Sequence, residues 1–203
     1  MWRKAPVWSL FIFWFALASV GHAVRPPAAA VASAHPLATE AGIAVLEAGG
    51  NAFDAAVAVS AALAVVEPYG SGIGGGGFWL LHRARDGRDV MIDGRERAPL
   101  AATADMYLDQ QGNVIPNASI DGVLAAGIPG VPAALDHLAR HYGRLPLSLS
   151  LGPAIVLARE GFPVDAVYQR MAAFRRSALR ASSTARRQFF LDSDMPPLGH
   201  LIK

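Results

Sequence analysis

The stretch from 34 to 99 constrains the fold of this chain most, because four kinds of local structure follow one another in it. Two alanine-rich segments come first, and each ends at glycine or proline. The glycine run 74–77 follows, and then two short apolar segments joined by Asp86-Gly87, a dipeptide typical of β-hairpin turns. A lone Arg95-Glu96 pair ends the stretch. This order predicts a mixed α/β chain in which helices pack against a sheet.

The alanine-rich segments predict two helices. The first covers 36–48 and ends at Gly49, since glycine readily adopts the left-handed conformation found just after helices. The second covers 52–66, with Asn51 as its N-cap and Asp54 at a spacing close to that of a capping box. Because the second helix consists almost wholly of Ala, Val and Leu, we expect it to be buried against a sheet.

The remaining pattern predicts further elements in sequence order. Two strands joined by a tight turn are expected at 78–84 and 88–93. The glycine, asparagine and proline content of 110–120 predicts a loop. Helical segments are expected at 105–108 (one turn), 131–142, 147–160 and 165–185.

Composition and charge argue against a disordered segment, a nucleic-acid-binding protein and thiol chemistry. The chain has 203 residues, of which 53% are hydrophobic, so it can build a core and is not a disordered segment. The formal charge of +2 comes from Arg3 and Lys4, and without them 16 basic residues balance 16 acidic residues. Nothing in this balance indicates nucleic acid as a partner. Cysteine is absent, which excludes disulfides and thiol chemistry.

Residues 1–23 predict a secretory signal peptide. Arg3 and Lys4 precede the apolar run 7–20, and Gly21 and Ala23 place small residues before a cleavage site. The run is shorter than the ~20 residues that a membrane-spanning helix needs, so an uncleaved anchor is the less favoured alternative. We therefore expect a bacterial protein that is periplasmic or secreted, with a flexible lead-in at 24–33 and no stable membrane span after cleavage.

The glycine run has the spacing of a dinucleotide-binding loop but the wrong context. Gly72, Gly74 and Gly77 fit a Gly-x-Gly-x-x-Gly pattern. Nucleotide loops follow a strand and open a helix, whereas this run follows a predicted helix and precedes a predicted strand. A structural turn beneath a substrate cleft is therefore expected.

Arg95 is the candidate ligand-binding residue. A guanidinium offers paired donors that match a carboxylate in a bidentate fashion, which lysine cannot do. Arg95 follows the second predicted strand, whose end could direct it into a cleft. The alternative is a structural ion pair with Glu96 or Asp93, and the residues alone favour this alternative because such pairs are common.

Six arginines lie in a stretch that has no acidic residue between Asp165 and Asp192. Such a cluster fits a nucleic-acid or lipid-headgroup patch, or one solvated helix face. Few aromatic residues that could stack on bases lie among them, which favours the solvated face. The cluster consists of Arg170, Arg175, Arg176, Arg180, Arg186 and Arg187.

His137 and His141 lie four residues apart on a predicted helix, a spacing that allows two side chains to share one metal ion. The zinc-protease pattern His-Glu-x-x-His is absent, because Leu138 follows His137. The sequence therefore favours two surface histidines, no metal site and no cofactor.

The motifs from residue 34 onward closely resemble those of γ-glutamyltranspeptidases, a family of N-terminal-nucleophile hydrolases. Asp93, Arg95, Glu96, Ala98 and Pro99 fit the family motif Asp-x-Arg-Glu-x-Ala-Pro. Similar segments continue at 104–109, 126–132, 142–146 and 153–162. The resemblance spans 34–203 and identifies this part of the chain as the N-terminal portion of the family's large subunit.

The resemblance implies a partial αββα sandwich of the N-terminal-nucleophile hydrolase type, truncated before its end. It also implies that Arg95 grips the α-carboxylate of the γ-glutamyl group of glutathione, with Glu96 in a weaker supporting role. The family's nucleophile is a Thr at the head of a small subunit, and its own α-amine serves as the base. Thr39, Thr103 and Thr184 stand in no similar processing site. The resemblance therefore implies no catalytic residue here, and a missing or separately encoded small subunit as partner.

The sequence is compatible with three functions. The first is the N-terminal part of an exported enzyme that transfers or hydrolyses γ-glutamyl groups and is inactive as this chain alone. The second is a secreted, non-catalytic protein that binds γ-glutamyl compounds or another protein. The third is a non-functional remnant. The first is preferred because the family motifs continue in order through the whole stretch 34–203.

Overall fold

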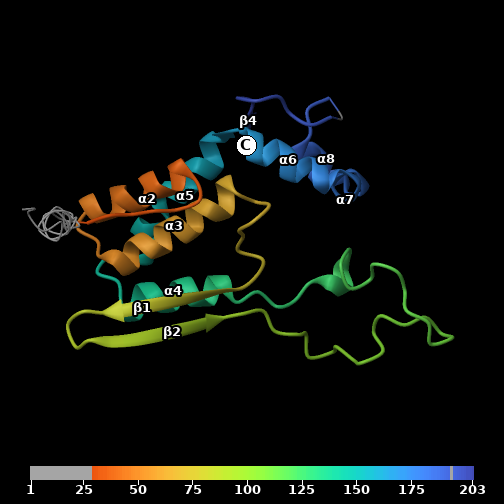
Figure 1. The fold of residues 1–203 in the computed structure, drawn as a ribbon, viewed down its shortest axis with the longest axis horizontal. Helices are drawn as coiled ribbons and strands as arrows, with labels where there is room; N and C mark the ends of the chain where they lie inside the picture. Colours follow the sequence, from red (N-terminus) through yellow and green to blue (C-terminus); the bar gives the residue numbers. More distant parts are fainter. Residues whose placement is uncertain (1–28, 193) are drawn as a thin grey trace, which may run out of the picture. The chain divides into compact units, whose positions relative to one another are not determined.

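The computed structural model describes residues 29–192 and 194–203 (Figure 1). The predicted signal peptide at 1–23 and the first part of the lead-in lie outside the described residues. Residues 29–33 form neither helix nor strand. Within the described ranges, none of the helices combines the length and the apolar character needed to cross a membrane.

Helices alternate with short strands along the chain. In sequence order the elements are α2 (Pro36–Glu47), α3 (Ala52–Val66), β1 (Gly77–Arg83), β2 (Arg88–Gly94), the 3₁₀ turn η1 (Val123–Ala125), α4 (Val131–His141), α5 (Leu147–Glu160), β3 (Phe162–Pro163), α6 (Ala166–Phe174), α7 (Arg176–Ala181), α8 (Ser183–Phe189) and β4 (Leu201–Ile202). The helices predicted at 36–48, 52–66, 131–142 and 147–160 are confirmed, with bounds that differ by no more than one residue. The helical turn expected at 105–108 is not a helix, because residues 105–107 form a hydrogen-bonded turn and Leu108 forms a β-bridge with Val114. Residues 110–120 form a loop, as predicted.

Helix α3 begins with the capping box that its sequence predicts. The Asn51 side chain accepts hydrogen bonds from the backbone N–H groups of Phe53 (2.8 Å) and Asp54 (3.1 Å). In return, Asp54 Oδ2 accepts one from the Asn51 N–H at 2.8 Å. Three donors at the start of the helix are thereby satisfied.

Helix α3 is buried, as its apolar composition predicts, but most of its neighbours are helices rather than strands. It packs against α2 and α5 and also contacts α4 (Figure 1). Its link to the sheet runs through Trp79 of β1, whose indole N–H donates to Ser60 Oγ at 3.2 Å. Small side chains on α3 such as Ala58 and Ala62, which are 0% exposed, allow the adjacent helices to approach closely.

The hairpin β1–β2 has the predicted turn, with each strand within one residue of its expected bounds. The strands pair antiparallel from Gly77↔Gly94 to Arg83↔Arg88. The N–H of Gly87 donates to the Arg83 carbonyl at 2.9 Å, and Gly87 has φ 66°, in the region that favours glycine.

The two faces of the hairpin have different surroundings. Trp79, Leu81, Val90 and Ile92 pack into the cluster formed with the helices. The opposite face carries three large apolar side chains that are exposed by 56% (Phe78), 77% (Leu80) and 64% (Met91). The described residues therefore cover one face of this sheet only.

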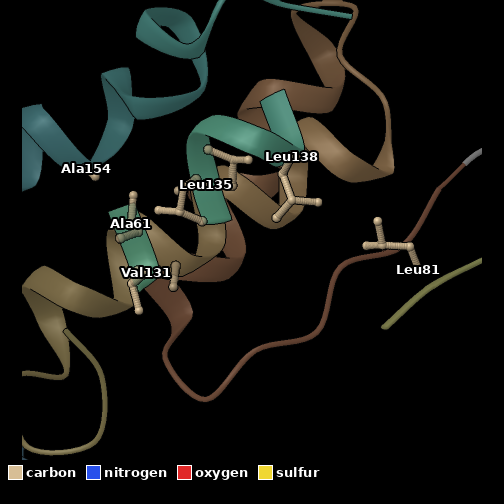
Figure 2. Packing of buried hydrophobic residues seen from close by; sticks show 10 residues of the cluster. Ala61, Leu81, Val131, Leu135, Leu138 and Ala154 are labelled. Carbon is tan, nitrogen blue, oxygen red and sulfur yellow. The ribbon is translucent and has the colours of Figure 1, made fainter. Parts of the chain in front are cut away.

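The largest core lies between the helices and the inner face of the hairpin (Figure 2). Val131, Leu135 and Leu138 recur at helical spacing on α4 and all are buried. They meet Ala61 of α3 and Ala154 of α5 in the same cluster. This packing fixes α4 beside β2, the strand that leads directly into Arg95.

The prediction of one helix over 165–185 is wrong, because the segment forms three short helices, α6 to α8. Arg175 leaves the helical geometry with φ −99° and ψ 11°. Ser182 is extended (φ −94°, ψ 123°), and its hydroxyl accepts a hydrogen bond from the Ala185 N–H at 3.2 Å. A serine N-cap therefore starts a new helix where the periodicity alone predicts continuation.

Candidate functional site

Arg95 lies directly after β2, and its guanidinium points away from the buried core. The Arg95 side chain is 66% exposed, and its guanidinium carbon lies 5.9 Å from the centroid of the Phe78 ring. A cation over an aromatic face is attracted to it, which restrains the side chain without using its N–H donors. The donors of Arg95 therefore stay available to an anionic ligand.

Of the two ion-pair partners that the sequence offered for Arg95, the structure shows Glu96 at long distance. Arg95 Nε lies 3.8 Å from Glu96 Oε2, and the Glu96 side chain is 39% exposed. An exposed pair at this distance contributes little to stability. Asp93 binds the backbone instead, because its Oδ1 accepts from the Arg95 N–H at 3.0 Å. Glu96 is thus a loose neighbour of the guanidinium, and Asp93 fixes the chain at the end of β2.

Three glycines allow the glycine run and the turn at 127–130 to lie in close contact with residues 94–96. A Cβ on Gly76 would lie 2.8 Å from Arg95 Cα, and a Cβ on Gly127 would lie 3.0 Å from Glu96 Cβ. A Cβ on Gly130 would overlap the Gly94 carbonyl oxygen and lie 2.6 Å from the Arg95 carbonyl oxygen. Any larger residue at these positions would push the arginine segment away.

Backbone hydrogen bonds join these three segments. The N–H groups of Gly130 and Val131 donate to the Gly75 carbonyl at 3.0 and 3.2 Å. Arg97 and Ile128 exchange a pair of hydrogen bonds at 3.1 and 2.8 Å. The glycine run is therefore a structural turn, as predicted, and it helps to hold Arg95 in place through backbone contacts.

Arg95 borders an open hollow of about 490 Å³ between β2, the arginine segment and α4. Residues from all three parts line it, among them Asp93, Arg95, Arg97, Ala133, His137 and Tyr142. Two guanidinium groups on one border suit a ligand that carries a carboxylate. No described threonine borders this hollow, since Thr39 lies in α2, Thr103 in a loop and Thr184 in α8.

The sequence prediction missed Arg97, Tyr142 and the glycine contacts at this site. Arg97 carries a usable signal, because residues two apart in an extended segment point to the same side. The role of Gly127 and Gly130 had a weaker signal, since the sequence predicted only a turn before the next helix. The contact between this turn and Arg95 depends on tertiary packing, which no local pattern reports.

The arginine cluster is partly paired. Arg175 forms an ion pair with Asp121, and Arg176 lies 3.2 Å from Asp194. Arg180 contacts the same carboxylate at 4.0 Å and also lies over the Phe190 ring. Acidic residues outside the 166–191 stretch thus meet several of the six cations, which supports the solvated-face interpretation over a nucleic-acid patch.

Comparison with known proteins identifies relatives over most of the described chain. The family model described as Gamma-glutamyltranspeptidase matches residues 38–203. The chain is 50% identical over 135 residues to a glutathione hydrolase proenzyme of Pseudomonas sp. (strain A14), which covers 66% of this chain and 23% of that protein. It is 47% identical over 146 residues to the glutathione hydrolase proenzyme of Escherichia coli (strain K12), covering 72% of this chain and 25% of that protein.

Solved structures give the same result for the fold. The γ-glutamyltranspeptidase of Helicobacter pylori matches with a TM-score of 0.83 and 43% identity, over 88% of this chain and 51% of that chain. The γ-glutamyltranspeptidase of Pseudomonas nitroreducens, complexed with L-DON, matches with a TM-score of 0.79 and 36% identity, over 88% and 52%. The chain thus has the mixed α/β fold of one part of these N-terminal-nucleophile hydrolases, and it spans about a quarter of the curated relatives.

Proposed function

The chain belongs to the gamma-glutamyltranspeptidase family, and on that basis we propose that it forms the N-terminal part of a γ-glutamyltransferase or glutathione hydrolase. Its substrate is glutathione or a related γ-glutamyl amide. Residues 34–203 form the large-subunit portion, 24–33 a lead-in and 1–23 an export signal. The protein acts in the periplasm or outside a bacterial cell.

The observation that carries this proposal is the presentation of Arg95. Its guanidinium is exposed beside the hollow, while its backbone is held by Asp93 and by the Gly75–Gly130 contact. A fixed fork of N–H donors binds the α-carboxylate of the γ-glutamyl group in a bidentate manner. Glu96, at 3.8 Å from Arg95 Nε, supports the orientation of the guanidinium weakly.

The nucleophile comes from a complementary portion of polypeptide. In this proposal the α-amine of an N-terminal Thr takes the proton of its hydroxyl, and the hydroxyl oxygen attacks the γ-glutamyl amide. The C–N bond breaks, and the amine leaves with the proton that the α-amine had taken. Water or an amino acid then displaces the Thr oxygen from the acyl group, and the Thr hydroxyl is restored. The curated relatives are several times longer than the match and are named as proenzymes, which fits a second portion that supplies this Thr. The exposed apolar face of the hairpin, formed by Phe78, Leu80 and Met91, offers a surface on which that portion packs.

Complementation tests this function directly. Residues 24–203 are purified alone and also fused to the remainder of the Escherichia coli relative beyond the matched segment. Glutamate release from glutathione is measured for both proteins. We expect no release from residues 24–203 alone, because an acyl-enzyme needs the missing Thr, and measurable release from a fusion that has cleaved itself.

Two results would count against the proposal. Release of glutamate by residues 24–203 alone would show that the chemistry resides in this chain. A fusion that folds and cleaves itself, yet leaves glutathione intact, would show that this chain does not form a γ-glutamyl site.

A further inference from the structure

Two histidines on α4 form a pair whose geometry the proposed function does not use. His137 and His141 are both exposed, and their rings stack with centroids 4.1 Å apart at an interplanar angle of 25°. Residues four apart lie above one another on the same side of a helix. The two exposed imidazole rings therefore lie close enough together to share one small ligand when the side chains turn a nitrogen of each ring toward it.

A backbone hydrogen bond selects the tautomer of His141. Its Nδ1 lies 3.0 Å from the carbonyl oxygen of His137. A carbonyl oxygen can only accept, so Nδ1 carries the proton and the lone pair of the neutral ring is on Nε2. Histidines that bind metals commonly have this arrangement, in which the second ring nitrogen donates to a carbonyl or carboxylate.

The surrounding charges permit a cation at this pair. Arg140 lies between the two histidines in sequence, but its Nε donates to Asp136 Oδ1 at 2.8 Å, so its charge is paired. Arg95 and Arg97 border the same hollow as His137 and oppose a cation. Because both guanidinium groups are exposed to water, their repulsion is screened.

From this geometry we propose that His137 and His141 bind a divalent transition-metal cation, of which Cu²⁺, Ni²⁺ and Zn²⁺ are the suitable class. Imidazole nitrogen suits these cations, whereas Mg²⁺ and Ca²⁺ prefer oxygen ligands. No group of three or more His, Asp or Glu side chains in the described ranges is arranged to hold a metal, so water completes the coordination. The site is therefore open, unlike the closed four-ligand sites that hold structural zinc.

The site does not depend on the proposed function, because it uses other side chains and needs no substrate. Residues 24–203 are purified without an affinity tag and titrated calorimetrically with Ni²⁺, Cu²⁺, Zn²⁺ and Mg²⁺. The variants are His137→Ala, His141→Ala and the double replacement. Alanine favours helix more than histidine does, so these variants keep α4 intact, which circular dichroism verifies.

His82→Ala is the matched control. His82 is exposed like the pair, but its Nδ1 contacts Asp89 Oδ1 at 2.8 Å on the hairpin, so it offers a rival imidazole–carboxylate site. Removal of a group that hydrogen-bonds to a metal ligand commonly lowers the metal affinity about 10- to 100-fold. Removal of a ligand itself should therefore lower the metal affinity at least about tenfold. We expect that loss of Ni²⁺ affinity in each single variant at α4 and none in His82→Ala.

Nuclear magnetic resonance with Cu²⁺ gives an independent measurement of where the metal binds. It should bind more tightly than Ni²⁺ and Zn²⁺, and it should broaden backbone amide signals most strongly around 137–141. The proposal is wrong if the wild-type chain binds none of the three transition metals. It is also wrong if the double variant binds Ni²⁺ as tightly as wild type, or if the affinity falls in His82→Ala instead.

Discussion

The buried carboxylate of Asp54 accepts a hydrogen bond at 2.9 Å from the backbone N–H of Arg144, which lies 90 residues later in the chain. The same carboxylate accepts from Leu145 at 3.3 Å and closes the capping box with Asn51 at 2.8 Å. The Asn51 amide adds a hydrogen bond of 2.7 Å to the Tyr142 carbonyl. One pair of side chains therefore joins the start of α3 to the loop after α4, the helix that borders the Arg95 hollow.

Replacement of Asp54 should destabilise the fold strongly. Asp54 is 0% exposed, so Asp54→Ala leaves three backbone N–H groups without their acceptor. These donors belong to partly buried or exposed residues, where water replaces part of the lost acceptor, so we expect a loss of about 1–3 kcal/mol in the free energy of unfolding. Urea denaturation followed by circular dichroism measures it.

Asp136→Ala on α4 is the control for Asp54→Ala. Asp136 pairs with Arg140 on the helix surface, where an ion pair contributes about 0.5 kcal/mol or less. Equal losses in the two variants would contradict the role assigned to Asp54.

Gly130→Ala tests the close contact that holds the arginine segment. The new methyl group would overlap the Gly94 carbonyl oxygen, so the turn or the end of β2 must shift. Such overpacking costs about 1–3 kcal/mol. By contrast, a Cβ on the exposed Gly74 meets nothing within 4 Å, so Gly74→Ala should change the free energy of unfolding by about 0.5 kcal/mol or less. Thermal unfolding compares the two, and a stable Gly130→Ala protein would contradict the account.

Burial of Tyr168 should lower the free energy of unfolding at high pH. Its side chain is buried, its hydroxyl has no hydrogen-bond partner among the described residues, and burial raises its pKa to about 12. A tyrosine in the unfolded chain ionises near pH 10, so the contribution of Tyr168 to the free energy of unfolding should fall between about pH 10 and 12 and be constant below that range. Unfolding by urea at a series of pH values measures this slope.

Two phenylalanine variants show how much of this pH dependence comes from Tyr168. Tyr168→Phe should remove the contribution of Tyr168 to the alkaline slope and leave stability at pH 7 unchanged or up to about 1 kcal/mol higher, because no hydrogen bond is lost. Tyr107→Phe is the control, since its hydroxyl donates to the Leu124 carbonyl at 3.1 Å. It should keep the slope and lose up to about 1.5 kcal/mol at pH 7. An unchanged slope in Tyr168→Phe would refute this assignment.

Local chemistry explains which parts of the fold could be predicted. The capping box of Asn51 and Asp54 and the turn at Gly87 need only residues within a few positions of each other. The break at Ser182 had a local signal too, since serine is a frequent N-cap, but continued helical periodicity outweighed it. The neighbours of α3 depend on tertiary packing, and the sequence predicted a sheet where helices lie.

The sequence singled out Arg95 as a candidate, but not the contacts that support it. Its residues alone favoured a structural ion pair, and the resemblance to the family motif Asp-x-Arg-Glu-x-Ala-Pro made a carboxylate-binding role the preferred prediction. The contacts of Gly76, Gly127 and Gly130 with 94–96 join segments that lie apart in the sequence, and only the folded chain shows them. The ion pair with Glu96 was predicted as an alternative, and the structure shows it as a long, exposed contact.

If Arg95 binds the α-carboxylate of a γ-glutamyl substrate, Arg95→Lys should lower kcat/KM for glutathione in the self-cleaved fusion protein. The charge is kept but the bidentate fork is lost, and since a charge-assisted hydrogen bond contributes about 1.5–3 kcal/mol, we expect a loss of roughly 10- to 100-fold. Arg85→Lys in the hairpin turn is the control and should keep full activity. Self-cleavage should persist in both variants, because it involves no bound glutamyl group. An Arg95→Lys enzyme with the kcat/KM of the parent fusion would contradict the account.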